Sequence, residues 1–350
     1  MRLTLNKMNK FYSGKKVLSY GTPFIFSLGN RSTGKTFYWT DRNINRFLEG
    51  GHKFIYVRRY DEDLKRVAPT YFNANAFKHP DVEFEVRGNG KSGTQLLINK
   101  EVAGITIALS LANKFKSVSL PDFDTIVFDE FLPEDGQYLP TEVSNALSLY
   151  QTVARGNGKS IREDVKFIFI ANNVTLNNPY FRELKIRDRI QLDTEYSVDS
   201  DRAWVVELFN NAVIGNEIAS TAFGKMISKT KYGEYAIKSQ FYLDDDTFIQ
   251  KPSGNSRYYC TLIYNDSSYG VYEYTDESLF YISNKTDPNC KAVYALTTKD
   301  HRPNYLLLNR NKYNPLFDML RFAYDNALLR FESADAKWMF LDFMQIVIKV

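Results

Sequence analysis

The stretch Gly29-Asn30-Arg31-Ser32-Thr33-Gly34-Lys35-Thr36 constrains the fold of this chain more than any other. It fits the pattern G-x-x-x-x-G-K-[ST] at every fixed position, and the apolar run Pro23 to Leu28 leads directly into it. In such a loop, successive backbone N–H groups and the start of the following helix face phosphate oxygens. The alternative, a chance glycine turn before a helix, should occur on the order of once per hundred sequences of this length. The stretch therefore predicts a nucleotide-binding site.

The last two residues of this loop predict the chemistry of the site. Lys35 is expected to reach the β- and γ-phosphates, and the Thr36 hydroxyl is expected to hold Mg²⁺. The predicted ligands are therefore ATP and Mg²⁺.

A second diagnostic stretch, Thr125-Ile126-Val127-Phe128-Asp129-Glu130, describes a buried strand that ends in two carboxylates. Asp129 is expected to orient Mg²⁺ or its waters, and Glu130 to polarise the water that attacks the γ-phosphate. Alone, a strand ending in Asp-Glu is often only a surface cap, but its place about ninety residues after a phosphate loop strengthens the prediction. Because small-molecule kinases must exclude water, the adjacent glutamate favours ATP hydrolysis.

The order of elements predicts an α/β fold, a parallel-sheet P-loop NTPase domain of the ASCE type over residues 1–198. Arg58 and Arg59 follow a predicted strand and are expected on the nucleotide side of the sheet, although solvated surface arginines are equally consistent. The expected helices are Phe37–Leu48 and Thr141–Val153, the core strands are Lys53–Val57, Thr125–Glu130, Lys166–Ala171 and Arg189–Leu192, and a meander covers Val82–Arg87, Thr94–Ile98 and Val102–Leu109.

The remainder of the chain is expected to form a helical linker over residues 199–240 and a smaller α+β domain over residues 241–350. This division rests on a change of composition to short aromatic and β-branched runs. The expected strands are Arg257–Tyr264, Tyr269–Tyr274, Leu279–Ile282 and Ala292–Thr297, and the expected closing helices are Leu316–Phe331 and Lys337–Val347.

Composition excludes several classes of protein. Hydrophobic residues make up 44% of the 350 residues and no apolar run approaches the length of a membrane span, so we expect a cytoplasmic protein without a membrane partner. A net charge of +4 permits contact with nucleic acid without arguing for it. Cys260 and Cys290 are interpreted as thiols, because nothing indicates an oxidising compartment.

Four further residues each have two interpretations. Arg155, just past a predicted helix, is either a partner of the helix dipole or an arginine that reaches a neighbour's γ-phosphate. Asn172, at the end of a core strand, is either a γ-phosphate sensor or a turn residue. Lys114 and Lys116 belong either to a solvated turn or to a basic loop facing a polyanion.

With these motifs in hand, the chain resembles the DNA-packaging ATPases of phi29-like phages, nearly end to end. The local matches are more specific than the nucleotide motifs, and they are Phe54–Tyr60, Thr125–Phe131, Pro140–Val153, Asn178–Phe181 and Val293–Thr298. The loop after Glu130, Leu132-Pro133-Glu134-Asp135, departs from the pattern of this family because it is acidic rather than basic. Its charge counts against DNA binding by this loop.

The resemblance implies a homo-oligomeric ring, expected to be a pentamer, at the portal vertex of the prohead in the host cytoplasm. It would pump double-stranded DNA inward, docked on the portal or connector and, in the best-known member, on a packaging RNA. By motif position, Lys35, Thr36, Asp129 and Glu130 keep the functions given above, Arg155 becomes the trans-acting finger and Lys116 a pore lysine that engages DNA. The C-terminal domain is expected to resemble a vestigial RNase H-like nuclease, without nuclease activity because its first strand has no acid.

Two alternatives to a packaging motor remain open from the sequence. A helicase or other nucleic-acid-remodelling ATPase would prefer single strands stacked on aromatic side chains. A nucleotide-gated ring scaffold would bind ATP without turnover.

Overall fold

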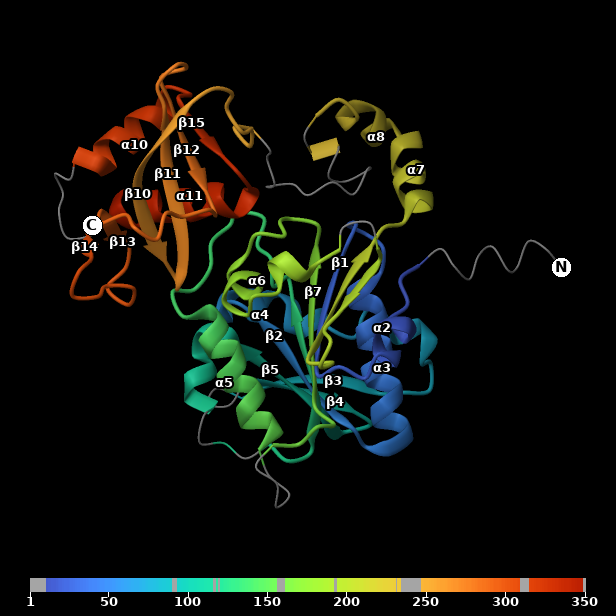
Figure 1. The fold of residues 1–350 in the computed structure, drawn as a ribbon. Coiled ribbons are helices and arrows are strands. Elements are labelled where there is room, and N and C mark those ends of the chain that lie inside the picture. The colour runs from blue at the N-terminus through green and yellow to red at the C-terminus, as the bar shows by residue number, and fades with distance from the viewer. Residues whose placement is uncertain are drawn as a thin grey trace. The chain divides into compact units, whose positions relative to one another are not determined.

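The computed structural model describes residues 11–89, 93–115, 118, 120–155, 161–191, 194–230, 232–233, 247–308 and 315–348. The chain divides into two compact units, Met1–Leu243 and Asp244–Val350, and each is described by itself (Figure 1).

A nine-stranded sheet forms the centre of the first unit, in the order β3-β4-β5-β2-β6-β7-β1-β9-β8. Neighbouring strands from β5 to β9 are parallel, and β3, β4 and β8 add antiparallel edges. This confirms the predicted α/β class. The strands are β1 Phe24–Gly29, β2 Lys53–Arg58, β3 Phe84–Asn89, β4 Gly93–Ile98, β5 Glu101–Ala108, β6 Phe123–Asp129, β7 Lys166–Asn172, β8 Tyr196–Val198 and β9 Trp204–Phe209.

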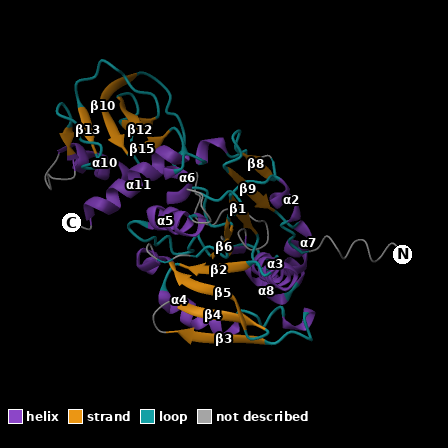
Figure 2. Cartoon of the chain, turned by 90° about the horizontal axis from the view of Figure 1, so that it is seen from below, coloured by secondary structure: helices purple, strands orange, loops and turns teal. Residues whose placement is uncertain are grey.

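Helices cover both faces of this sheet (Figures 1 and 2). Along β7, Phe167 and Phe169 pack into one core with α5, whereas Ile168 and Ile170 pack into another with Trp39 of α3. Two-sided burial explains why the central strands are continuous apolar runs. The helices of this unit are α2 Lys15–Ser19, α3 Lys35–Gly50, α4 Asp61–Val67, α5 Glu142–Ala154, α6 Pro179–Glu183, α7 Ala212–Ser220 and α8 Ala222–Ile227.

Two predictions in the first unit are wrong. The strand expected at Arg189–Leu192 does not form in its described part, because Arg187–Arg189 form a short 3-10 helix and Ile190 and Gln191 follow it without strand structure. Leu192 lies outside the described residues. The expected helical linker is interrupted at Trp204–Phe209, which is strand β9 and pairs along the full length of β1. Helices α7 and α8 follow only after this strand, so the parallel sheet extends past residue 198.

The second unit contains a six-stranded sheet in the order β14-β13-β10-β11-β12-β15. Strands β10, β11 and β12 are antiparallel, and β13 and β14 run parallel to β10, an order that agrees with the RNase H-like fold expected here. The elements are β10 Ser256–Tyr264, β11 Ser267–Tyr274, β12 Leu279–Ser283, β13 Val293–Ala295, β14 Leu306–Leu307, α10 Pro315–Asp325, β15 Leu329–Phe331 and α11 Ala334–Ile348.

One helix of the second unit is shorter than expected. The predicted helix Leu316–Phe331 ends at Asp325, and Leu329–Phe331 form strand β15 beside β12. Cys260 is buried and Cys290 is partly exposed, and both are free thiols. Among the described residues, no helix is long and apolar enough to cross a membrane.

Candidate nucleotide site

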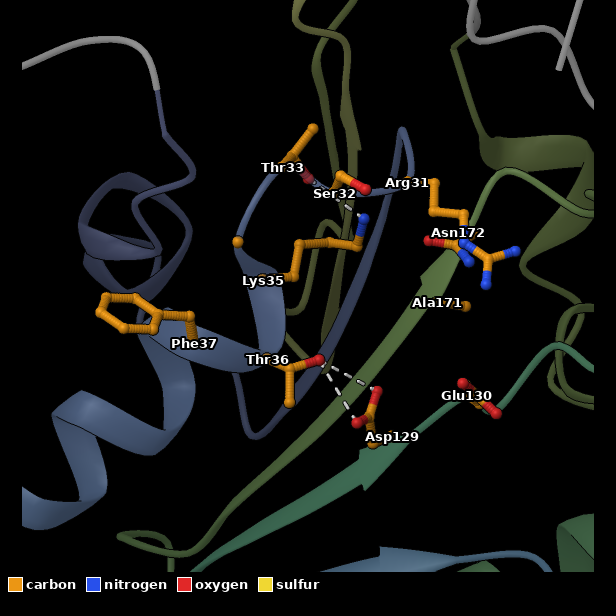
Figure 3. A pocket seen from close by; sticks show the side chains of 11 residues that line it. Arg31, Ser32, Thr33, Lys35, Thr36, Phe37, Asp129, Glu130, Ala171 and Asn172 are labelled. Atoms are coloured by element: carbon orange, nitrogen blue, oxygen red, sulfur yellow. Dashed lines mark hydrogen bonds between the residues drawn. The ribbon is translucent and has the colours of Figure 1, made fainter. Parts of the chain in front are cut away.

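The phosphate loop connects β1 to the first turn of α3, as the sequence predicts (Figure 3). Gly34 is the residue before α3 and has φ of 89°, a left-handed conformation that glycine adopts without strain. Thr33 donates from its hydroxyl to the carbonyl of Asn30 at 2.9 Å, which closes the loop on itself. These contacts hold the loop against the first turn of α3, and the start of a helix is a position that favours anions.

Lys35 lies within this loop with its ammonium group directed at the loop backbone. Nζ donates to the carbonyl oxygens of Gly29 at 2.9 Å and Asn30 at 2.8 Å. Burial lowers the pKa of Lys35 to about 8, while Asp129 and Glu207 act in the opposite direction. The side chain is therefore a desolvated cation at the edge of the cavity, where a phosphate would be its strongest partner.

Asp129 and Thr36 meet in the lining of the same cavity (Figure 3). The Thr36 hydroxyl lies 3.4 Å and 3.3 Å from the two carboxylate oxygens of Asp129, and Tyr56 donates to Asp129 Oδ2 at 2.9 Å. Burial raises the pKa of Asp129, whereas the Arg58 charge lowers it. A hydroxyl and a carboxylate are hard oxygen ligands that suit Mg²⁺, so this pair fits the predicted metal.

Glu130 lies at the open side of the same cavity. It has φ of 58°, and its side chain is 65% exposed with Oε2 2.6 Å from Arg58 Nη1. The cavity has a volume of about 320 Å³. Its lining joins both sequence motifs and consists of Arg31, Ser32, Thr33, Gly34, Lys35, Thr36, Phe37, Asp129, Glu130, Ala171 and Asn172.

Asn172 is the last residue of β7 and is paired in register with Gly29. It lines the cavity, so the structure brings it to the phosphate loop rather than leaving it in a remote turn. Arg31 projects from the loop toward it (Figure 3). Its Nη1 lies 3.3 Å from Glu134 Oε1 of the acidic loop.

The remaining predicted site residues lie elsewhere. Arg155 is exposed at the C-terminal cap of α5 and is not among the residues that line the cavity. Lys114 is exposed in the 3-10 helix Leu109–Phe115. Lys116 lies outside the described residues.

Sequence reasoning missed three residues that support the site. Tyr56 binds Asp129 from the neighbouring strand β2, and Glu142 binds the buried Arg59 at 2.7 Å. Glu207 of β9 lies fully buried behind the loop. No local signal indicates any of the three, because β2 is a continuous apolar run and each contact depends on which elements are neighbours in the fold.

Acidic residues in the second unit are scattered. Strand β10 contains no Asp or Glu. Among the residues that the structure describes, no group of three or more His, Cys, Asp or Glu side chains converges in a way that could hold a metal ion.

Comparison with known proteins agrees with the resemblance seen in the sequence. The model of the family described as podovirus DNA encapsidation protein (Gp16) matches residues 6–346. The DNA packaging protein of Bacillus phage phi29 is 36% identical over 325 residues, covering 92% of this chain and 93% of the relative. That of Bacillus phage B103 is 34% identical over 319 residues, covering 91% and 95%.

A solved structure also matches over the whole chain. The chain in the bacteriophage phi29 genome packaging motor assembly is 33% identical with a TM-score of 0.74, and the match covers 97% of this chain and 100% of that one. The family model and the relatives each span nearly the full sequence. The chain therefore belongs to the podovirus DNA encapsidation protein (Gp16) family.

Proposed function

We propose that this chain is an ATP-hydrolysing motor that translocates double-stranded viral DNA into a preformed phage head. The observation that carries the proposal is that the phosphate loop, Asp129 and Glu130 line one cavity. Family membership supports the DNA as the moved substrate. Binding alone would require the loop and a metal carboxylate, whereas an adjacent acid at the open side of the cavity suits hydrolysis.

In this proposal, the loop amides and Lys35 bind the phosphates, and Thr36 and Asp129 hold Mg²⁺. The metal would supply charge neutralisation between the β- and γ-phosphates. Glu130 orients the attacking water, and Asn172 senses the γ-phosphate from the end of β7. Both residues line the same cavity as the phosphate loop, which supports these two assignments.

Arg155 is proposed to act in trans, because its exposed position at the end of α5 lies away from the residues that line its own subunit's cavity. Such an arginine stabilises transition-state charge and accelerates turnover by roughly 10³-fold or more. The functional form would then be a homo-oligomeric ring, with five subunits expected, docked on the portal at the portal vertex in the host cytoplasm. A packaging RNA is a further candidate partner, because the resemblance associates one with the best-known member of the family. Lys114 and Lys116 are proposed to contact DNA phosphates, so that binding is salt-sensitive and nearly independent of sequence.

The C-terminal domain is proposed to lack nuclease activity. Two-metal cleavage requires carboxylates that converge from neighbouring strands, and β10 offers none. The proposed organisation keeps an ATPase domain, the linker helices α7 and α8, and this RNase H-like domain.

ATP hydrolysis by the full-length protein at low salt, with and without long double-stranded DNA, tests this function. DNA-stimulated turnover that falls by about 10²-fold or more in Glu130→Gln, with nucleotide binding retained, is the expected result. Wild-type turnover in that variant would refute the assignment of Glu130. Preference for single-stranded DNA would favour a helicase instead. Adding Arg155→Ala subunits to Glu130→Gln subunits should restore some turnover if the finger acts in trans.

A further inference from the structure

Arg59 forms a buried ion pair with Glu142 and contacts the peptide that follows Glu130. Its side chain is 6% exposed and that of Glu142 is 1% exposed. Nε donates to Glu142 Oε2 at 2.8 Å and Nη2 donates to Oε1 at 2.7 Å, so the guanidinium and carboxylate pair through two parallel bonds. Pairing through two parallel bonds fixes the orientation of the guanidinium in addition to neutralising its charge.

The same guanidinium also binds the backbone that carries Glu130. Nη1 lies 3.3 Å from the carbonyl oxygen of Glu130, and Nη2 lies 2.7 Å from that of Phe131. One side chain just after the end of β2 therefore holds the two successive carbonyl groups that follow β6. Since Glu130 has φ of 58°, this backbone is strained and needs surrounding contacts to keep it in place.

Glu142 is in turn held by the loop that precedes α5 and by α6. Its Oε2 accepts from the backbone N–H of Leu139 at 2.9 Å, and its Oε1 accepts from the Tyr180 hydroxyl at 3.1 Å. The carboxylate thus has its lone pairs occupied from three directions. A buried ion pair contributes little net stability over an apolar replacement, so its contacts with the Glu130 peptide point to positioning.

We propose that Arg59 and Glu142 form a positioning clamp that fixes the peptide after Glu130 and so aims the Glu130 carboxylate into the nucleotide cavity. The inference rests on the proposed function of Glu130. Neither clamp residue needs to touch the nucleotide phosphates, because the clamp acts through the backbone. Loss of the clamp should therefore reduce the rate of the chemical step and leave nucleotide affinity nearly unchanged.

Two clamp variants and a matched control test this inference in the full-length protein with double-stranded DNA. Arg59→Lys keeps the charge but loses the two parallel bonds, and Glu142→Gln keeps the size but loses the charge. The control is Arg46→Lys, because Arg46 pairs with Asp124 at 2.7 Å near the opposite end of β6 from Glu130. Both clamp variants should lower kcat by about tenfold or more, with KM and the Kd for a fluorescent ATP analogue changing less than about threefold. Arg46→Lys should retain kcat.

A double-variant cycle separates positioning from general structural damage. If Arg59 acts through Glu130, Arg59→Lys should cause no further loss in single-turnover hydrolysis when added to Glu130→Gln. The same fold-loss in both backgrounds, or an unchanged kcat in both clamp variants, would overturn the inference. Should Arg59→Lys fail to fold, Glu142→Gln in the same cycle decides. Full turnover in Glu130→Gln would instead refute the proposed function, which distinguishes the two failures.

Discussion

Arg58 Nη1 lies 2.6 Å from Glu130 Oε2. The carboxylate that we propose to orient water is therefore paired with the last side chain of strand β2. The same guanidinium nitrogen lies 3.5 Å from the carbonyl oxygen of Asp129. Arg58 thus contacts both acids at the end of β6, and it opposes the effect of burial on the pKa of Asp129. One residue thereby links the proposed metal ligand and the proposed base.

The Arg58–Glu130 pair predicts a restraint on basal turnover. A carboxylate oxygen held by a guanidinium is less available to accept a hydrogen bond from water. We expect Arg58→Gln to raise ATP hydrolysis without DNA by several-fold, about 2- to 10-fold, and to reduce stimulation by DNA. Steady-state assays at pH 8 with saturating Mg²⁺ measure both, with Arg66→Gln as the exposed control. A fall in basal turnover would show that Arg58 supports catalysis instead.

Lys35 predicts a pH dependence of nucleotide binding. Burial lowers its pKa to about 8, so the ammonium is charged below this pH and neutral above it. Because phosphate binds the charged form, affinity for ADP without Mg²⁺ should be nearly constant from pH 7 to 7.5. Above pH 8 it should fall by up to about tenfold per pH unit. Lys35→Met should bind weakly with a flat profile, and a flat profile in the wild type would contradict the prediction.

Much of the site could be predicted from the sequence because its parts are local. The phosphate loop and the Asp129–Glu130 pair are contiguous motifs at strand ends, and parallel strands bring their carboxyl ends together. Continuous apolar runs also identified β2, β6 and β7, since both faces of these strands are buried.

The errors arise where tertiary contacts override the local pattern. Strand β9 contains Glu207, a charged residue that indicates an exposed position, yet it is fully buried because Tyr12 and Ser27 bind its carboxylate. Strand β15 is three residues long and exists only beside β12. The Arg59–Glu142 pair joins residues far apart in sequence and depends on strand order.

Glu207 predicts a pH-dependent contribution to stability. Burial raises its pKa, and Ser27 and Tyr12 only partly offset this by donating to Oε2 at 2.6 Å and 2.8 Å. Because the pKa of Glu207 is higher in the folded state than its ordinary value of 4.5, its contribution to stability is fully present below pH 4.5. That contribution is lost as the pH rises through the pKa of the folded state. The free energy of unfolding of Glu207→Gln, relative to that of the wild type, should therefore be larger at pH 8 than at pH 4.5.

Urea unfolding of both proteins at the two pH values measures this difference, because contributions from other groups cancel between them. A stability difference that does not change with pH would contradict the raised pKa of Glu207. Tyr12→Phe serves as a control, since it removes one donor without removing the carboxylate.

Gly29 predicts a steric limit at the start of the phosphate loop. A Cβ atom at this position would lie 2.6 Å from the carbonyl oxygen of Phe209 on the paired strand β9, whereas none of the chain lies within 4 Å of a Cβ added at Gly88 on β3. Because a backbone atom cannot rotate away, Gly29→Ala must separate β1 from β9 and should lower the free energy of unfolding by about 1–3 kcal/mol. Gly88→Ala should be neutral or slightly stabilising.

Gly29→Ala should also weaken nucleotide binding, since the Gly29 carbonyl accepts from Lys35 at 2.9 Å and a shift of β1 would move this contact. Chemical denaturation and ADP titration of both variants measure the two effects together. If Gly29→Ala were as stable as Gly88→Ala, the contact between β1 and β9 would not be tight. Reduced stability with unchanged ADP affinity would mean that the loop holds its shape independently of β9, through α3 and its own hydrogen bonds.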